Sequence, residues 1–256
     1  MSGDSPILSW SEVIRTTIEE REVSSLDGVD RGFGNMLVAA LRGLTVSRPG
    51  TAFDDVRAFL ARPPAEQIIK SPYSDPRTFM KALRAAGRGR ASETKLGEIV
   101  NKSALPIIMF QRDLAHSVYE GDRYAPVRDW DQLGFDDNSS ATINQFHLAT
   151  SYRLAILAWD LESLDVLSTA LGAWFRIHAR RFGFNVHLYN TPIGAFADVV
   201  TKTIIWEDVS PGAETDRLMG LACTIEVIAE AYEAQGTTEM TANYVLMEPQ
   251  ALYGGD

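Results

Sequence analysis

The segment YRLAILAWDLESLDVLSTALGAWFRIHAR, residues 152–180, contains the change of hydrophobic period that decides the fold. Residues 154–159 are apolar at every position, which is typical of a strand covered on both faces. Asp160 is a good helix N-cap, and after it leucines recur at helical spacing while arginines gather at the C-terminal end. The segment therefore predicts a buried strand followed by one long helix over 160–180.

The apolar stripe of this helix indicates which face it buries. Its members are Leu164, Leu167, Leu171, then Trp174 or Phe175, and finally His178. We expect Leu164, Leu167, Leu171 and Trp174 to face a sheet.

Further strands are expected on both sides of the 152–180 segment, where residues alternate or are rich in β-branched types. Turn residues separate two pairs of them, at 191–194 and 210–212. Residues 218–235 fit a helix by their Ala and Glu content, but the alternation in Thr-Ile-Glu-Val-Ile favours a strand. The expected strands are 105–113, 143–159, 184–190, 195–209, 218–235 and 241–247.

The first hundred residues have a different pattern, in which apolar residues fall at helical spacing between prolines and glycines. Helices are expected at 7–22, 52–61 and 76–86, the last capped by Asp75, whereas 33–44 fits a helix or a strand. The predicted class is α+β: an antiparallel or mixed sheet with one long helix packed on it, preceded by a mostly helical N-terminal region. The expected division is 1–104 and 105–256.

The charge of the chain is unevenly distributed. The net charge is −10, a sign that argues against wrapping nucleic acid. Residues 77–95 hold six basic and one acidic residue, and residues 181–256 hold eleven acidic and three basic ones. Oppositely charged patches on identical subunits can join head to tail, although solvated faces give the same pattern.

Motifs for chemistry are missing from the sequence. The histidines, at 116, 147, 178 and 187, have no metal-ligand spacing, and no glycine-rich phosphate loop is present. Cys223 lies in an apolar stretch and is expected to be inert. The basic residues near Arg88 have no interleaved aromatic residues for stacking on bases. We therefore expect a protein that is not an enzyme and that binds neither a metal nor a cofactor.

The compartment is indicated by what the chain lacks. It has no stretch of about 18 uncharged apolar residues and no basic start followed by an apolar run. A single cysteine permits no internal disulfide. These features predict a soluble intracellular protein without membrane contact.

The order of elements from Leu105 onward resembles a known family. The segments are LPIIMFQRD, YRLAILAWD, ESLDVLSTALGAWFRIHAR, FNVHLYN, ADVVTKTIIWEDV and LACTIEVIAEAYE. In this order they look like the tail terminator and tail-completion proteins of long-tailed bacteriophages, closest to the sheath-terminating kind in contractile tails. The likeness covers about half of the chain and contains no invariant motif.

The resemblance implies a structural virion protein. It would form a homo-oligomeric ring, most often a hexamer, at the head-proximal end of the tail, between the tube and sheath proteins and the neck or connector proteins. DNA would pass transiently through the lumen, and no catalytic residue or cofactor is implied. A neck adaptor and an enzyme of unrecognised family are the alternatives. The charge pattern adds candidate subunit or partner contacts at Arg77, Lys81, Arg84, Arg88, Arg90, Glu226, Glu230 and Glu233.

Overall fold

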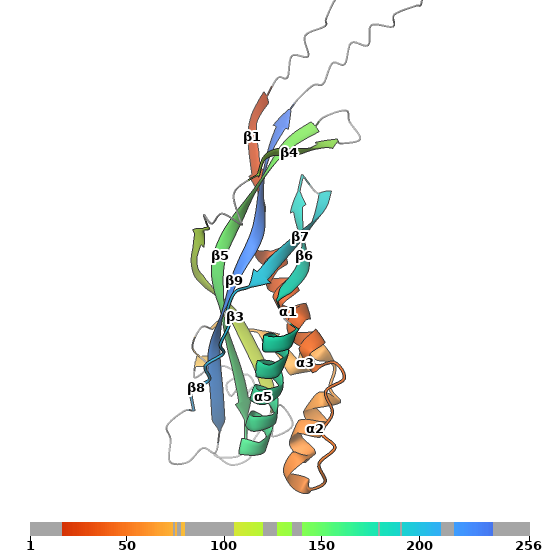
Figure 1. Cartoon of the computed structure of the whole chain (residues 1–256), viewed down its shortest axis with the longest axis vertical. Coiled ribbons are helices and arrows are strands. Elements are labelled where there is room, and N and C mark those ends of the chain that lie inside the picture. Colours follow the sequence, from red (N-terminus) through yellow and green to blue (C-terminus); the bar gives the residue numbers. More distant parts are fainter. Residues whose placement is uncertain are drawn as a thin grey trace, which may run out of the picture. The chain divides into compact units, whose positions relative to one another are not determined.

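The fold is taken from a computed structural model of the whole chain (Figure 1). The structure describes residues 17–73, 75, 78–79, 105–119, 127–134, 140–178, 180–189, 191–210 and 218–237.

Helices and strands follow one another in groups through these residues. The helices are α1 (Asp27–Leu41), the 3-10 turn η1 (Thr51–Phe53), α2 (Asp54–Leu60), α3 (Pro64–Gln67) and α5 (Leu161–Ile177). The strands are β1 (Thr17–Val23), β2 (Ile68–Lys70), β3 (Ile107–Val118), β4 (Val127–Gly134), β5 (Ser140–Ala158), β6 (Arg181–Leu188), β7 (Thr191–Val199), β8 (Glu207–Asp208) and β9 (Met219–Thr237).

The chain divides into two compact units, each assembled from separate stretches of sequence. The smaller unit comprises Met1–Val23, Val127–Gln145 and Tyr232–Asp256, and so holds β1, β4 and one end each of β5 and β9. The larger unit comprises Ser24–Pro126 and Phe146–Ala231 and holds the helices.

All of these strands belong to one mixed sheet with the main order β2-β3-β5-β9-β7-β6. β2 runs parallel to β3, whereas β3, β5, β9, β7 and β6 pair antiparallel where their pairings are defined. Residues Leu154–Ala158 of β5 are all buried, as their unbroken apolar run predicts. Ile107 pairs with Leu157 and Phe110 with Leu154, so the apolar ends of β3 and β5 form the middle of the core.

Helix α5 begins where the sequence predicts. The Asp160 carboxylate accepts a hydrogen bond from the amide of Ser163 at 2.6 Å, which satisfies a free N–H of the first turn. Leu164, Leu167 and Leu171 are buried, as expected. Trp174 was expected to complete the stripe, but Phe175 is buried and Trp174 is only half-buried.

Helix α1 settles the open choice between helix and strand for 33–44. It packs against β6 so closely that a Cβ on Gly28 would overlap the carbonyl oxygen of Asn185, and one on Gly32 would lie 3.1 Å from the carbonyl oxygen of Gly183. Glycines four residues apart let the helix backbone approach the strand, as Figure 1 shows for α1 and β6. Helix α1 therefore covers the carbonyl groups on the outer edge of β6.

One aromatic ring joins α1 to the rest of the core. Phe33 stacks on Tyr152 of β5 with ring centroids 4.0 Å apart, and it also contacts Phe110, Phe175 and Phe182. Strands β3, β5 and β6 and helix α5 thus meet around a single side chain from α1.

The predicted fold class is wrong. The N-terminal region is not mostly helical, because β1 and β2 both join the sheet. The sheet carries two helices of similar length, α1 with 15 residues and α5 with 17, rather than one long helix. Residues 17–22 were expected to be helical, but Arg21 pairs with Gln235 and Val23 with Glu233 in the antiparallel ladder to β9. This long-range pairing overrides the local helical spacing.

Several smaller expectations have clear outcomes. Helix α2 confirms the helix expected at 52–61, and β9 confirms the strand favoured for 218–235. The turn expected at 191–194 is wrong, because β7 already begins at Thr191. The strand expected at 195–209 ends early, at Val199. The strand expected at 241–247 and most of the helix at 76–86 lie outside the described residues, although the amide of Thr78 donates to Asp75 as a cap.

Candidate functional site

The five basic contact residues expected in the 77–95 segment cannot be placed. Arg77, Lys81, Arg84, Arg88 and Arg90 lie outside the described residues. Their role in subunit or partner contacts stays a prediction.

The three acidic contact residues lie on β9, but they do not form one surface. Glu230 accepts a hydrogen bond from the amide of Phe196 at 2.9 Å and lies 3.3 Å from the guanidinium of Arg181. Glu233 belongs to the smaller unit, where it lies 3.0 Å from Arg21 on β1. Only Glu226 has an exposed side chain. Glu230 and Glu233 therefore hold neighbouring strands together, which leaves Glu226 as the acidic contact candidate.

The outer edge of β3 is open within the described part of the chain. β2 pairs with Ile108, Met109 and Phe110 only, and no described strand pairs with the same side of β3 beyond them. The ladder to β5 is interrupted by a bulge between Arg112 and His116. Leu114 is 88% exposed and Val118 is 62% exposed. An open strand edge that displays apolar side chains can pair with another chain.

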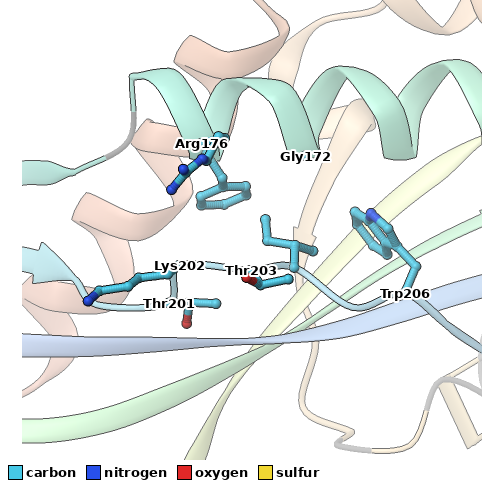
Figure 2. Close-up of a pocket in the computed structure, with 8 residues that line it drawn as sticks. Gly172, Arg176, Thr201, Lys202, Thr203 and Trp206 are labelled. Atoms are coloured by element: carbon cyan, nitrogen blue, oxygen red, sulfur yellow. The ribbon is translucent and has the colours of Figure 1, made fainter.

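A second surface feature is a groove of about 530 Å³ beside α5 (Figure 2). One wall is the C-terminal half of α5, and the other is the segment 201–206, which follows β7. The sequence suggested a strand there, but the amide of Val200 donates to Glu226, the ladder then stops, and the chain bends away from β9. The lining residues are Gly172, Phe175, Arg176, Thr201, Lys202, Thr203, Ile204 and Trp206.

The groove has a cationic end and an aromatic end. Figure 2 shows Arg176 and Lys202 pointing toward the same end from opposite walls, with Trp206 at the other end. Among the described residues, neither Arg176 nor Lys202 has a carboxylate partner. Gly172 leaves room over the indole, since a Cβ there would lie 3.8 Å from Trp206 Nε1. The groove can therefore accept an anionic group and an apolar group side by side.

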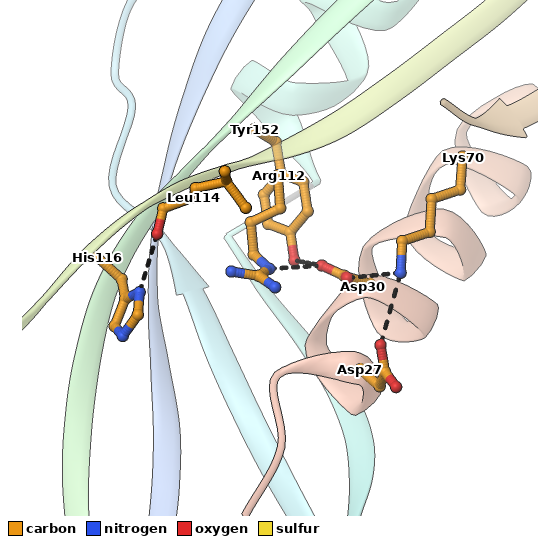
Figure 3. Close-up of polar contacts among 7 residues, drawn as sticks. All are labelled: Asp27, Asp30, Lys70, Arg112, Leu114, His116 and Tyr152. Carbon is orange, nitrogen blue, oxygen red and sulfur yellow. Dashed lines mark hydrogen bonds and ion pairs between the residues drawn. The ribbon is translucent and has the colours of Figure 1, made fainter. Parts of the chain in front are cut away.

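A buried carboxylate anchors α1 to three strands (Figure 3). Asp30 is 2% exposed and accepts hydrogen bonds from Tyr152 Oη at 2.7 Å and from Arg112 Nε at 3.0 Å. Its second oxygen lies 2.7 Å from Lys70 Nζ, and Lys70 also lies 3.6 Å from Asp27. Burial, followed by the hydrogen bond to Asp30 and its charge, raises the pKa of Tyr152, so the phenol stays protonated as a donor.

The groups around Asp30 are paired with one another in a way that holds elements of the fold together. Each oxygen of Asp30 has a donor, and Lys70 and Arg112 together balance the charges of Asp30 and Asp27. These groups hold α1 against β2, β3 and β5. Sequence reasoning missed it, although Asp30 lies three residues before Phe33 and so on the same helix face, a position where an isolated carboxylate requires partners.

Residue types that bind metals or attack substrates are scattered over the described elements. No group of three or more His, Cys, Asp or Glu side chains there is arranged to hold a metal ion. Cys223 is buried in β9, and burial raises the pKa of its thiol to about 12, so its reactive thiolate is scarce. None of the described helices has the length and apolar character needed to cross a membrane.

Comparison with known proteins assigns no family. The chain matches no protein-family model, and a search of curated proteins finds no significant match.

Proposed function

We propose that this protein is a structural subunit of a homo-oligomeric ring, a hexamer, that ends the tail tube and sheath of a contractile bacteriophage tail and joins them to the neck. The observation that carries the proposal is the order in which β5, α5, β6, β7 and β9 follow β3, with β4 between β3 and β5 and the two-residue β8 between β7 and β9. The same order, read from the sequence, underlies the resemblance to tail terminator proteins. The subunit assembles in the host cytoplasm and resides in the virion, with DNA passing through the ring.

The open edge of β3 supports self-assembly. A ring subunit needs two different complementary patches, because each copy contacts one neighbour on either side. The β3 edge from Arg112 to Val118, with Leu114 and Val118 exposed, supplies one patch that adds backbone hydrogen bonds to apolar contact.

The way in which the polar side chains are paired also supports a structural role. Among the described residues the best-connected polar cluster is the one around Asp30, whose two carboxylate oxygens both have donors and which tethers a helix. The Asp30 carboxylate is therefore engaged within the fold.

Size-exclusion chromatography with light scattering, followed by negative-stain electron microscopy, tests the proposal on the full chain. A closed ring of about six times the 28.3 kDa subunit mass is expected. The ring should cap tubes polymerised from the tail tube protein of the same phage at one end only. A protein that stays monomeric at all concentrations, or a ring that does not bind such tubes, would contradict the assignment.

A further inference from the structure

We infer that the groove beside α5 binds an acidic, apolar segment from a second copy of this chain, namely residues 238–256. This inference deepens the proposed ring function and rests on it. It assigns a ligand to a surface that neither the ring proposal nor the β3 edge explains.

The groove itself defines the chemistry of its occupant. Arg176 and Lys202 face one end without a carboxylate partner among the described residues, in a chain whose net charge is −10. Phe175, Ile204 and Trp206 supply apolar surface along the same groove. Just outside the lining, Ile177 is 65% exposed and Ile205 is 70% exposed. The best-matched occupant is an extended peptide with apolar side chains beside carboxylates.

Residues 238–256 have this composition. They contain the apolar run Tyr244-Val245-Leu246-Met247 followed directly by Glu248, together with Glu239 and Asp256, and no Lys or Arg. The segment follows Thr237, the last residue of β9, and lies outside the described residues. Nineteen residues can reach about 60 Å when extended, so the segment can extend well beyond the end of β9.

The nearest carboxylate on β9 does not neutralise the groove. The amide of Glu226 donates to Thr201 Oγ1 at 2.6 Å, which fixes the wall of the groove to the strand. The Glu226 side chain is exposed and is not paired with Lys202 in the described part of the chain. Arg176 also lies in the last turn of α5, where the helix dipole favours a cation, but this leaves its outward charge available.

Cysteine pairing between two different variants of the full chain tests the contact. One variant carries Thr203→Cys in the groove, and the other carries Leu246→Cys, with Glu248→Cys as a second position. The native Cys223 is buried, so we expect it to form no disulfide in this experiment. Because each variant has one engineered thiol, a disulfide between the two positions can form only between copies. We expect this mixed dimer on mild oxidation of an equimolar mixture.

Three further variants show whether the groove makes the contact. Arg176→Glu with Lys202→Glu should lower mixed-dimer yield about 10-fold or more, through charge reversal at both cations. Gly172→Met, which fills the groove without changing charge, should lower it by a similar factor. Arg31→Glu with Arg42→Glu reverses two exposed charges elsewhere and should leave the yield unchanged. Thermal unfolding midpoints within a few degrees of the parent show that each variant is folded.

The outcomes separate this inference from the ring proposal. A mixed dimer that depends on the groove supports the inference. No mixed dimer overturns it, since the segment of a second copy is then absent from the groove. A third variant that carries both Thr203→Cys and Leu246→Cys tests the chain's own segment: a disulfide that forms only within this single chain also overturns the inference. Rings without the mixed dimer refute the inference alone, whereas a mixed dimer without rings refutes the ring.

Discussion

Two strand edges of the larger unit differ in whether another element covers them. The edge of β6 is covered by α1, whose Gly28 and Gly32 lie against the carbonyl groups of Asn185 and Gly183. The edge of β3 beyond Phe110 has no described partner and carries the exposed side chains of Leu114 and Val118. A covered edge cannot accept a further strand, whereas an open edge can, so the contrast makes the β3 edge the better candidate for a contact with another chain.

Removing Asp30, which anchors the helix that covers the β6 edge, should have the largest effect on the unfolding free energy. Asp30→Ala leaves Arg112 and Tyr152 without their shared acceptor and removes the polar tether of α1 to β2, β3 and β5, while the contacts of Phe33 remain. We expect a loss of about 2–4 kcal/mol of unfolding free energy, below the upper range for buried pairs because Lys70 reaches solvent. Urea unfolding followed by circular dichroism measures it, with Tyr152→Phe as the milder comparison at about 1 kcal/mol. Equal losses from both variants would mean that the ion pairs contribute little.

Disrupting the close contact between α1 and β6 should have the next largest effect on the unfolding free energy. Gly28→Val places a branched side chain where the Asn185 carbonyl oxygen lies, so either α1 or β6 must shift. The expected loss is about 1–3 kcal/mol, the usual cost of overpacking. Gly172→Ala in α5 is the control, because its Cβ meets only ordinary contact, and helix propensity should make it neutral or slightly stabilising. A stable Gly28→Val variant would show that α1 does not need this close approach.

Charging the open edge should change assembly and leave folding intact. Leu114→Glu with Val118→Glu removes apolar contact and places two carboxylates on the strand. We expect the ring to dissociate in light scattering while unfolding free energy stays within about 0.5 kcal/mol of the parent, as for most surface changes. Leu161→Glu serves as control, because it changes an apolar position at the start of α5 that is 57% exposed and lies away from the β3 edge. If both variants assemble alike, the β3 edge is not a subunit contact.

The smallest expected effect is on the reactivity of Cys223 on β9, the strand that lies between the β3 and β6 edges in the sheet order. Cys223 of β9 is buried with a raised pKa, so a thiol reagent at pH 8 should modify it far more slowly than a free peptide thiol. Gly28→Val should speed this labelling, and the double substitution on β3 should not. The same pKa rise means that stability from this group is present below the usual value of 9 and declines as pH rises toward 12. Fast labelling of the parent protein would show that the sheet opens readily.

The predictable parts of the fold were those that local sequence determines. Asp160 and the leucines of α5 predicted that helix because capping and stripe agree within one segment. Trp174 and Phe175 are adjacent, so periodicity alone did not separate the buried ring from the half-buried one. β1 was missed because its strand depends on pairing with β9, about 200 residues later in the chain.

The candidate site was less predictable than the fold. The groove depends on 201–206 leaving the ladder after Val199, whereas Thr201, Thr203 and Ile204 have the composition of a strand. The roles of Glu230 and Glu233 depend on Arg181 and Arg21, which other strands bring near them. Charge counts along a sequence do not contain these pairings.

The pairing of β1 with β9 also has a consequence for synthesis on the ribosome. Thr17 pairs with Thr237 and Val23 with Glu233, so β1 cannot complete its pairing until about 200 further residues have left the exit tunnel. At about 5–20 residues per second, this delay lasts roughly 10–40 seconds. Both long strands, β5 and β9, contribute to both units, so neither unit is complete in a nascent chain that stops short of β9. The late closure of this ladder would delay the completion of both units until β9 has been synthesised.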